Sequence, residues 1–253
     1  MRELKDLLIN YAGMSESQKT PANTSEQSDI YLEPWKREVE GIYEAMMLVD
    51  RKATDPNNPG FDGQDVLAIN KLVMNDPFNP HLFGTLRRAI VTMSVRVRGE
   101  LRKPDFTSVH PDELPRLFAD FSNELAERSS GISRQSKVGE VIGIASWAHQ
   151  KVIELHPFID GNGRTARLLV DFIFKRAGLP YITDWGAKDD EYKDVVDRAF
   201  KANSHDIFRN FLAEKLLSRA DDVKKTDPSL TEMMDKIKSE TLFYLQGLRP
   251  DAT

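Results

Sequence analysis

The most constraining feature of the sequence is a polar turn between two long helical patterns. Apolar residues recur at helical spacing over residues 137–155, and a second helical pattern covers residues 164–177 before Gly178 and Pro180 end it. Residues 156–163 interrupt the two patterns and end in Gly-Asn-Gly. We therefore expect two long helices joined by a tight turn that is rich in polar groups.

The rest of the chain is also mostly helical in pattern. Only residues 94–98 alternate in the manner of a strand, and residues 106–109 are the expected hairpin partner. Further helices are expected over residues 35–49, 64–74 and 111–128, two or three across 188–219, and one in the tail at 228–247. The expected fold class is therefore mostly α with one small β-hairpin.

Length and composition favour one domain with appendages. Of the 253 residues, 40% are hydrophobic, which is enough to bury a core. Residues 1–34 include a stretch rich in Ser, Gln, Thr and Asn that has no apolar period, so we expect a weakly structured N-terminal arm. The expected division is this arm, a helical domain over residues 35–219 and a C-terminal helical tail over residues 220–253.

Charge, hydropathy and cysteine content exclude several classes of protein. A formal net charge of −5 argues against a general nucleic-acid binder. No apolar run approaches the roughly 18 to 20 residues that span a bilayer, so we expect no membrane partner. Cysteine is absent, which excludes disulfides, a thiolate nucleophile and a cysteine-based zinc site. We expect a cytoplasmic protein, although a secreted effector could have the same composition.

The turn at residues 156–167, HPFIDGNGRTAR, gathers groups that bind anions. The glycines on either side of Asn162 allow a tight turn whose N–H groups point at one spot, and the following helix adds its positive N-terminal end. Arg164 and Arg167 are three residues apart and share one face of that helix. Backbone donors, a helix dipole and two guanidinium groups together predict a cradle for a polyphosphate.

Two further side chains of this turn can supply chemistry. Asp160 offers a hard carboxylate that could hold Mg²⁺ between phosphate oxygens, and His156 could accept a proton from an incoming hydroxyl. A base, a metal carboxylate and an anion hole fit phosphoryl or nucleotidyl transfer. The plain alternative is a histidine that caps a helix before a glycine-rich turn. The combination of eight defined positions favours the functional interpretation, because each residue type is only a few per cent of usage.

The same string resembles the signature of the Fic family, HPFx(D/E)GNGRxxR, and matches it completely. The resemblance extends more loosely over residues 36–215, through FGTLRRA at 83–89, VHPDELPRLFADF at 109–121 and ANSHDIFRNFL at 202–212. It implies a helical Fic-type fold within residues 35–219, with its core at about 84–215, in which the hairpin is a flap that registers a target segment. It also implies transfer of AMP from Mg²⁺-bound ATP to a Ser, Thr or Tyr hydroxyl of a target protein, self-modification included, with release of pyrophosphate.

The resemblance further implies a role for each matching residue. His156 would be the general base, and Phe158 would anchor the turn in the core. The nucleotide and metal positions that it implies are Gly161, Asn162 and Gly163 as the anion hole, Arg164 for the phosphates, Arg167 for the terminal phosphate, Asp160 for Mg²⁺ and, by a looser match, Asn203 for the adenine or ribose.

Regulation is less well specified by the sequence. Many Fic proteins carry an inhibitory glutamate in the pattern [S/T]xxxE[G/N], and Glu40-Gly41 resembles its end, but Lys36 stands where Ser or Thr is expected. The segment 38–47 looks more like a core helix than an inhibitory helix. Control by Glu40, by a separate antitoxin chain, by a homo-oligomer, or no such control all stay open.

Two classes of alternative function also stay open. A related enzyme could transfer another phosphate-containing group or remove AMP, and a nucleotide-binding regulatory module could have little turnover. The complete GNGRxxR favours a triphosphate donor, and the retained His156 and Asp160 argue against a module that only binds. Among the other histidines, His149 is expected to be a packed or hydrogen-bonded helix residue rather than a second base.

Overall fold

Helices account for most of the structure. The computed structural model describes residues 28–76, 78–91, 95–97, 100–102, 108–185 and 191–247. The helices are α2 (Ser28–Thr54), α3 (Gly63–Met74), α4 (Leu114–Ser130), α5 (Val138–Leu155), α6 (Asn162–Arg176), α7 (Glu191–Lys201), α8 (His205–Thr226) and α9 (Thr231–Gly247), with short 3-10 turns η2 (Pro80–Leu82) and η4 (Pro228–Leu230). Within the described residues, none of these helices combines the length and the apolar character that crossing a membrane requires.

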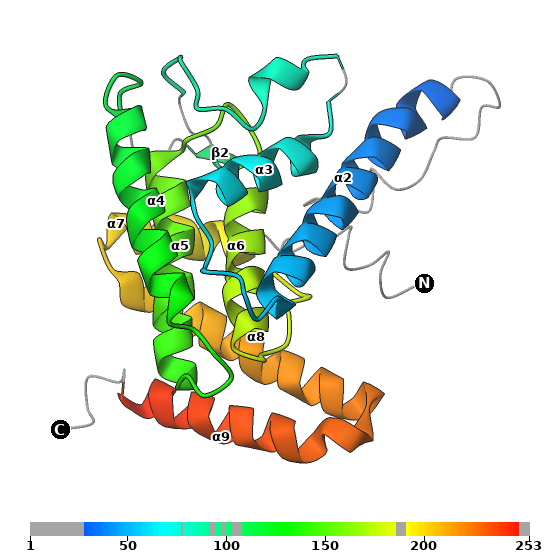
Figure 1. Cartoon of the computed structure of the whole chain (residues 1–253), viewed down its shortest axis with the longest axis vertical. Helices are drawn as coiled ribbons and strands as arrows, with labels where there is room; N and C mark the ends of the chain where they lie inside the picture. Colours follow the sequence, from blue (N-terminus) through cyan, green and yellow to red (C-terminus); the bar gives the residue numbers. More distant parts are fainter. Residues whose placement is uncertain are drawn as a thin grey trace.

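The two helices on either side of the polar turn form the centre of the molecule. Helices α5 and α6 pack against each other, and α2, α3, α4 and α8 pack around them (Figure 1). Helix α6 is buried on nearly every side between Thr165 and Phe174, and Phe172, Ile173 and Phe174 are fully buried. Burying each such side chain contributes about 1.5–3 kcal/mol. Because the core surrounds α5 and α6, the turn that joins them has a rigid support.

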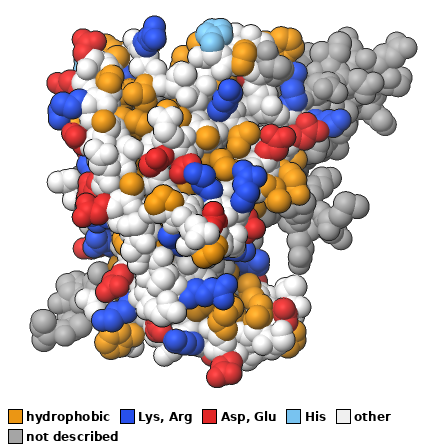
Figure 2. Space-filling view, in the orientation of Figure 1, with side chains coloured by type: hydrophobic (Ala, Val, Ile, Leu, Met, Phe, Trp, Pro, Cys, Tyr) orange, Lys and Arg blue, Asp and Glu red, His pale blue; other side chains and the backbone are white. Residues whose placement is uncertain are grey.

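Helix α9 covers the end of this bundle. It packs against α8 and the start of α5, and Figure 1 shows it lying across the far end of the molecule from α3. Met234 and Ile237 are its main buried apolar residues. Lys238 bridges to Asp221 of α8 at 2.5 Å. The surface in Figure 2 mixes acidic and basic side chains among apolar ones over the described residues that it shows.

Most of the predicted helices are confirmed, and the largest differences lie at two boundaries. Helix α2 begins at Ser28 rather than at residue 35, and residues 1–27 of the predicted arm lie outside the described residues. Helix α8 continues to Thr226, so the prediction that residues 220–227 form a polar stretch between two helices is wrong. The reason is that Ala220 is fully buried and Val223 packs against the core, so the helical face persists despite the charges around it.

The predicted hairpin is present but its second strand was misplaced. Strand β1 (Val95–Val97) pairs antiparallel with β2 (Glu100–Arg102), with Arg96 opposite Leu101. The prediction that residues 106–109 form the partner is therefore wrong. Val97 pairs with Glu100, and residues 98 and 99 between the two strands lie outside the described residues. Residues 103–107 lie outside the described residues, and Ser108 Oγ donates to the Val91 carbonyl at 2.7 Å.

Candidate active site

The polar turn is built on two residues with left-handed backbone conformations. His156 follows the last residue of α5 with φ 46°, and Gly161 precedes α6 with φ 79°. A side chain on Gly161 would also meet Asn70 Nδ2 and Met74 Sδ, each at 2.8 Å from its Cβ. Only glycine meets both conditions, because other residues are strained at such φ values. The turn therefore depends on the glycine that the signature places there.

Asn162 closes the turn onto its own backbone. Its Oδ1 accepts from the Phe158 N–H at 3.0 Å, and its Nδ2 donates to the Phe158 carbonyl at 2.9 Å. Phe158 itself is fully buried, as predicted for an anchor. These two bonds occupy the Asn162 side chain internally, so the structure gives it the task of shaping the turn rather than touching a ligand.

The start of α6 presents backbone donors at this turn. The first backbone bond of the helix runs from the Thr165 N–H to the Gly161 carbonyl at 2.9 Å, so the N–H groups of residues 162–164 precede the helical ladder. Gly161 provides no side chain to cap them. Such a helix end carries partial positive charge and binds anions.

Two residues outside the signature hold the turn in place through hydrogen bonds to its backbone carbonyls. Arg87 is buried, and it donates to the carbonyls of His156, Ala89 and Val109 through Nε, Nη1 and Nη2 at 2.7, 2.8 and 2.5 Å. Asn70, fully buried on α3, donates to the Asp160 carbonyl at 2.9 Å and accepts from the Gly84 N–H at 2.9 Å. The sequence marked residues 83–89, which include Arg87, only by their resemblance to the family. It gave no sign of Asn70, which belongs to no recognisable motif.

His156 is largely buried at the edge of this turn. Burial, together with the nearby Arg87 charge, lowers the pKa of its imidazole from the ordinary value of 6.5 to about 4. The Ile153 carbonyl and Asp160 oppose the shift only in part. The imidazole is therefore neutral near pH 7, the form that can accept a proton.

Arg164 is held by a carboxylate from α2. Its Nη1 forms an ion pair with Glu38, and its Nη2 lies 3.8 Å from Asp160 Oδ1. The Arg164 side chain is 14% exposed and that of Glu38 is 26% exposed, so water screens the pair only partly. Burial raises the pKa of the Glu38 carboxyl, and the Arg164 charge opposes this shift. Glu40, the residue that the sequence pattern had suggested, is exposed and lies two residues further along α2.

The remaining predicted residues differ in how they relate to the turn. Arg167 is buried on α6, and its guanidinium carbon lies 4.8 Å from the centre of the Tyr192 ring of α7. His149 is fully buried on α5 and its Nε2 lies 2.8 Å from Tyr192 Oη, which agrees with the prediction of a hydrogen-bonded helix residue. Asn203 follows α7 with φ 46° and is exposed, and no described contact joins it to the turn.

Asp160 fits the requirement for a magnesium ligand. Its side chain is 68% exposed, beside the anion-binding end of α6, and Oδ1 accepts from the Gly161 N–H at 2.5 Å. Mg²⁺ is usually bound by one or two carboxylates together with substrate phosphates, so one accessible carboxylate is enough here.

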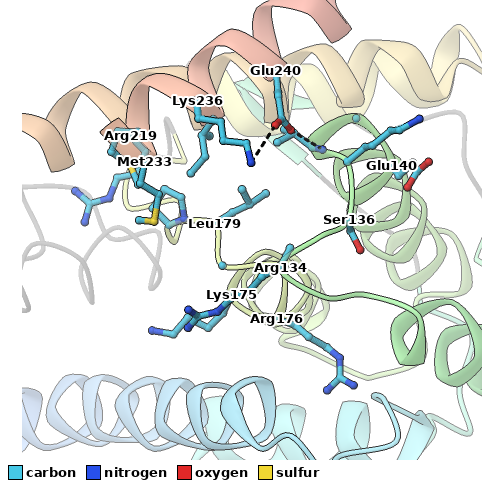
Figure 3. Close-up of a pocket in the computed structure, with 18 of the residues that line it drawn as sticks. Arg134, Ser136, Glu140, Lys175, Arg176, Leu179, Arg219, Met233, Lys236 and Glu240 are labelled. Atoms are coloured by element: carbon cyan, nitrogen blue, oxygen red, sulfur yellow. Dashed lines mark hydrogen bonds and ion pairs between the residues drawn. The ribbon is translucent and has the colours of Figure 1, made fainter. Parts of the chain in front are cut away.

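A large cavity lies at the opposite ends of α5 and α6. It measures about 1830 Å³ and is bordered by the end of α6, the start of α5, and α9. Figure 3 shows Lys236 and Glu240 of α9 paired with each other at one border of the cavity, with Leu179 and Arg134 at another. No residue of the signature lines this cavity. The chemistry-bearing groups are instead concentrated at the polar turn.

Comparisons with known proteins agree on one family. A family profile described as Fic/DOC family matches residues 60–174. The chain is 30% identical over 189 residues to an Aedes aegypti protein named Protein adenylyltransferase Fic, covering 68% of this chain and 35% of that protein. It is 27% identical over 175 residues to the Nematostella vectensis protein of the same name, covering 69% and 36%. The chain thus spans about a third of the length of these relatives.

Solved structures share the fold. A Fic domain containing signaling protein from Bacteroides thetaiotaomicron superposes with a TM-score of 0.54 at 19% identity, covering 98% of this chain and 88% of that one. A Fic family protein from Desulfovibrio desulfuricans gives a TM-score of 0.56 at 19% identity, covering 85% and 62%. At such identities these likenesses concern the arrangement of helices.

Proposed function

The chain belongs to the Fic/DOC family, and from this premise we propose that it is a protein adenylyltransferase. It transfers AMP from ATP to a Ser, Thr or Tyr hydroxyl of a target protein, and it releases pyrophosphate. The observation that carries the proposal is the neutral His156 imidazole at the edge of a turn whose backbone donors and arginines suit a polyphosphate. The adenylyltransferase names of the relatives support the same reaction, although the chain covers only part of their length.

His156 acts as the general base in this proposal. The target hydroxyl oxygen attacks the α-phosphorus, its proton passes to an imidazole nitrogen, and the bond from that phosphorus to the pyrophosphate oxygen breaks. A phosphodiester to the target side chain is formed. A positioned base of this kind contributes about 10²–10⁴-fold to the rate.

The turn binds and orients the triphosphate. Gly161, Asn162 and Gly163 supply the backbone of the anion hole, Arg164 binds phosphate oxygens, and Arg167 faces the terminal phosphate. Asp160 holds Mg²⁺, which when bound neutralises charge on the α- and β-phosphates. Asn203 is proposed to face the adenine or ribose, on the basis of its resemblance alone. The domain that carries these residues is proposed to span residues 35–219.

Glu38 is proposed to restrain the enzyme. Glu38 occupies Nη1 of Arg164, a donor that a phosphate oxygen would otherwise use. The nucleotide must therefore displace Glu38 or bind without the full contribution of Arg164. Release could come from a partner chain, from another copy of this chain, or from movement of α2.

Mass spectrometry of the intact protein tests the function. We expect incubation with ATP and Mg²⁺ to add the mass of AMP to the chain or to a protein target, and more in a Glu38→Ala variant. His156→Ala should fold and bind nucleotide but should lose nearly all of this labelling. Addition of phosphate instead of AMP, or no addition to any protein even in Glu38→Ala, would contradict the proposal.

A further inference from the structure

Three buried side chains next to the polar turn form a hydrogen-bonded row that connects three helices. Arg167 of α6, Tyr192 of α7 and His149 of α5 are each less than a tenth exposed. His149 Nε2 lies 2.8 Å from Tyr192 Oη, and Tyr192 and Arg167 share a side-chain hydrogen bond. Sequence reasoning assigned no role to Tyr192. The three residues come from distant parts of the chain, so only the fold brings them together.

The direction of these hydrogen bonds follows from the groups themselves. A guanidinium has donors and no acceptor, so Tyr192 Oη must accept from Arg167. We assign the tyrosine proton to the contact with the other neighbour, so that His149 Nε2 is its acceptor. This arrangement requires a neutral His149 whose proton is on Nδ1, the nitrogen that has no hydrogen-bond partner among the described residues. Burial, with the Arg167 charge, lowers the pKa of His149 well below 6.5 and keeps it neutral.

Aromatic packing holds His149, the acceptor end of this row of side chains, in place. The His149 ring stacks on Phe208 with centroids 4.0 Å apart and an interplanar angle of 19°. On α7, the Tyr192 ring meets the edges of the His149 and Trp185 rings at 5.6 and 5.8 Å. Neither ring can turn without disturbing its neighbours, because protein cores are closely packed. The Tyr192 hydroxyl is therefore a fixed acceptor for Arg167.

Arg167, the donor end of this row of side chains, lies against the anion-binding turn. A Cβ placed on Gly163 would be 3.6 Å from Arg167 Nη1 and 3.7 Å from Tyr192 Oη. Both polar atoms thus border the signature glycine, at the side of the turn where the first N–H groups of α6 emerge. A shift of the Tyr192 hydroxyl would change where Arg167 points relative to the bound phosphates.

We propose that Tyr192 and His149 are positioning residues that aim Arg167 at the terminal phosphate of the nucleotide. Tyr192 accepts from the guanidinium, and His149 orients the Tyr192 hydroxyl so that its lone pairs face Arg167. The inference rests on the proposed function, because it concerns the triphosphate that the turn would bind.

Nucleotide preference provides the first test. The affinities of α,β-methylene-ATP and α,β-methylene-ADP, which cannot donate AMP, are measured by calorimetry in a Glu38→Ala background. We expect Arg167→Ala to remove most of the preference for the triphosphate analogue, and Tyr192→Phe to reduce it about tenfold, the effect of one hydrogen bond to a charged group. The double variant should show no more loss than Arg167→Ala alone, since both changes remove one interaction.

Matched variants separate positioning from stability. Tyr181→Phe removes another partly buried tyrosine hydroxyl, which bonds Asp50 at 2.9 Å away from the turn, and should leave the preference unchanged. His149→Gln retains an acceptor for the Tyr192 proton and should keep most of the preference, whereas His149→Phe should lose it. A loss that follows melting temperature across these variants, Tyr181→Phe included, would overturn the inference.

A second measurement does not depend on nucleotide. Rotation of the Arg167 guanidinium can be followed by NMR in protein labelled at arginine, and Tyr192→Phe should accelerate it while Tyr181→Phe should not. An unchanged rotation, or a triphosphate preference retained in Tyr192→Phe, overturns this inference alone. Absence of any triphosphate preference in the Glu38→Ala parent contradicts the proposed function and the inference with it.

Discussion

His156 lies where α5 ends, in surroundings that disfavour its charged form. Its pKa is about 4 in the folded protein against an ordinary 6.5. Between these values the unfolded chain binds a proton that the folded protein does not, so stability falls as pH decreases from 6.5 to 4. The loss attributable to His156 should approach about 3 kcal/mol at pH 4.

Urea unfolding of the wild type and His156→Gln at pH 7 and pH 4.5 measures this contribution. We expect His156→Gln to lose less stability than the wild type over that interval. Equal losses in the two proteins would show that the imidazole titrates normally in the folded state.

Glu38 offers the clearest residue-level test of restraint. Replacing Glu38 with Ala leaves Arg164 available for phosphate, so the affinity for ATP should rise about tenfold, at a small cost in melting temperature. Glu40→Ala is the matched control, since Glu40 is exposed on the same helix. The restraint is refuted if calorimetry gives the same ATP affinity for Glu38→Ala and Glu40→Ala.

At the residue scale, the sequence predicted the signature groups but not their supports. The residues 156–167 stand together in one string, so their association needs no knowledge of the fold. Asn70, Tyr192 and Glu38 reach the turn only through the packing of helices, and nothing in their local sequence marks them. Arg87 stands in a segment, residues 83–89, that the sequence marked only by its resemblance to the family, without a role. The sequence pattern suggested Glu40 as the inhibitory glutamate. However, the face of α2 that packs on α6 carries Glu38, which pairs with Arg164.

At the scale of elements, the crossing of α2 over α3 controls how Glu38 approaches the turn. A Cβ on Gly41 would collide with the Leu72 carbonyl oxygen and lie 2.7 Å from Asn75 Cβ, so α2 can approach α3 only through a glycine. Gly41→Ala should destabilise the protein by about 1–3 kcal/mol through overpacking, despite the better helix propensity of alanine.

Gly143 is the natural comparison for Gly41. A Cβ there meets no atom within 4 Å, so Gly143→Ala on α5 should be neutral or stabilising by up to about 1 kcal/mol. Thermal unfolding of both variants distinguishes the two effects. Equal stability of Gly41→Ala and the wild type would mean that α2 does not pack on α3 as described.

The types of the helices were predictable, whereas some of their ends were not. Apolar spacing marked α3, α4 and α5 closely, because a buried apolar stripe recurs along each of them. The end of α8 was missed because its charged residues pair with α9, an interaction invisible in a local pattern. The second hairpin strand was missed because residues 100–102 are a short charged segment without an apolar alternation of their own.

At the scale of the whole molecule, α9 should unfold together with the central helices. Ile237 of α9 is 7% exposed and belongs to the same core as α5 and α8. Ile237→Ala should lower the free energy of unfolding by about 2–4 kcal/mol in a single transition. Because the polar turn lies at the other end of α5, nucleotide affinity should not change.

Phe243→Ala provides the control on α9, since this side chain is 80% exposed, and its stability should stay within about 0.5 kcal/mol of the wild type. Denaturant unfolding followed by fluorescence and by circular dichroism measures both variants. Two separate transitions, with only the smaller one affected by Ile237→Ala, would contradict a common core.

The fold class followed from the sequence because helical periodicity is local, and the family followed from one contiguous string. The packing of α2 against α6 and the contact of Tyr192 on α7 with Arg167 on α6 could not be predicted, since they depend on which faces of distant helices meet. The restraint by Glu38 and the positioning of Arg167 both depend on that packing.

The central claim is that the polar turn presents a triphosphate to His156 so that AMP is the group transferred. The most direct measurement uses ATP labelled at the α-phosphate in one reaction and at the γ-phosphate in another, with the Glu38→Ala protein and its His156→Ala counterpart. We expect label from the α-phosphate only on protein, and only when His156 is present. Label from the γ-phosphate, or α-label that is unaffected by His156→Ala, would contradict the account.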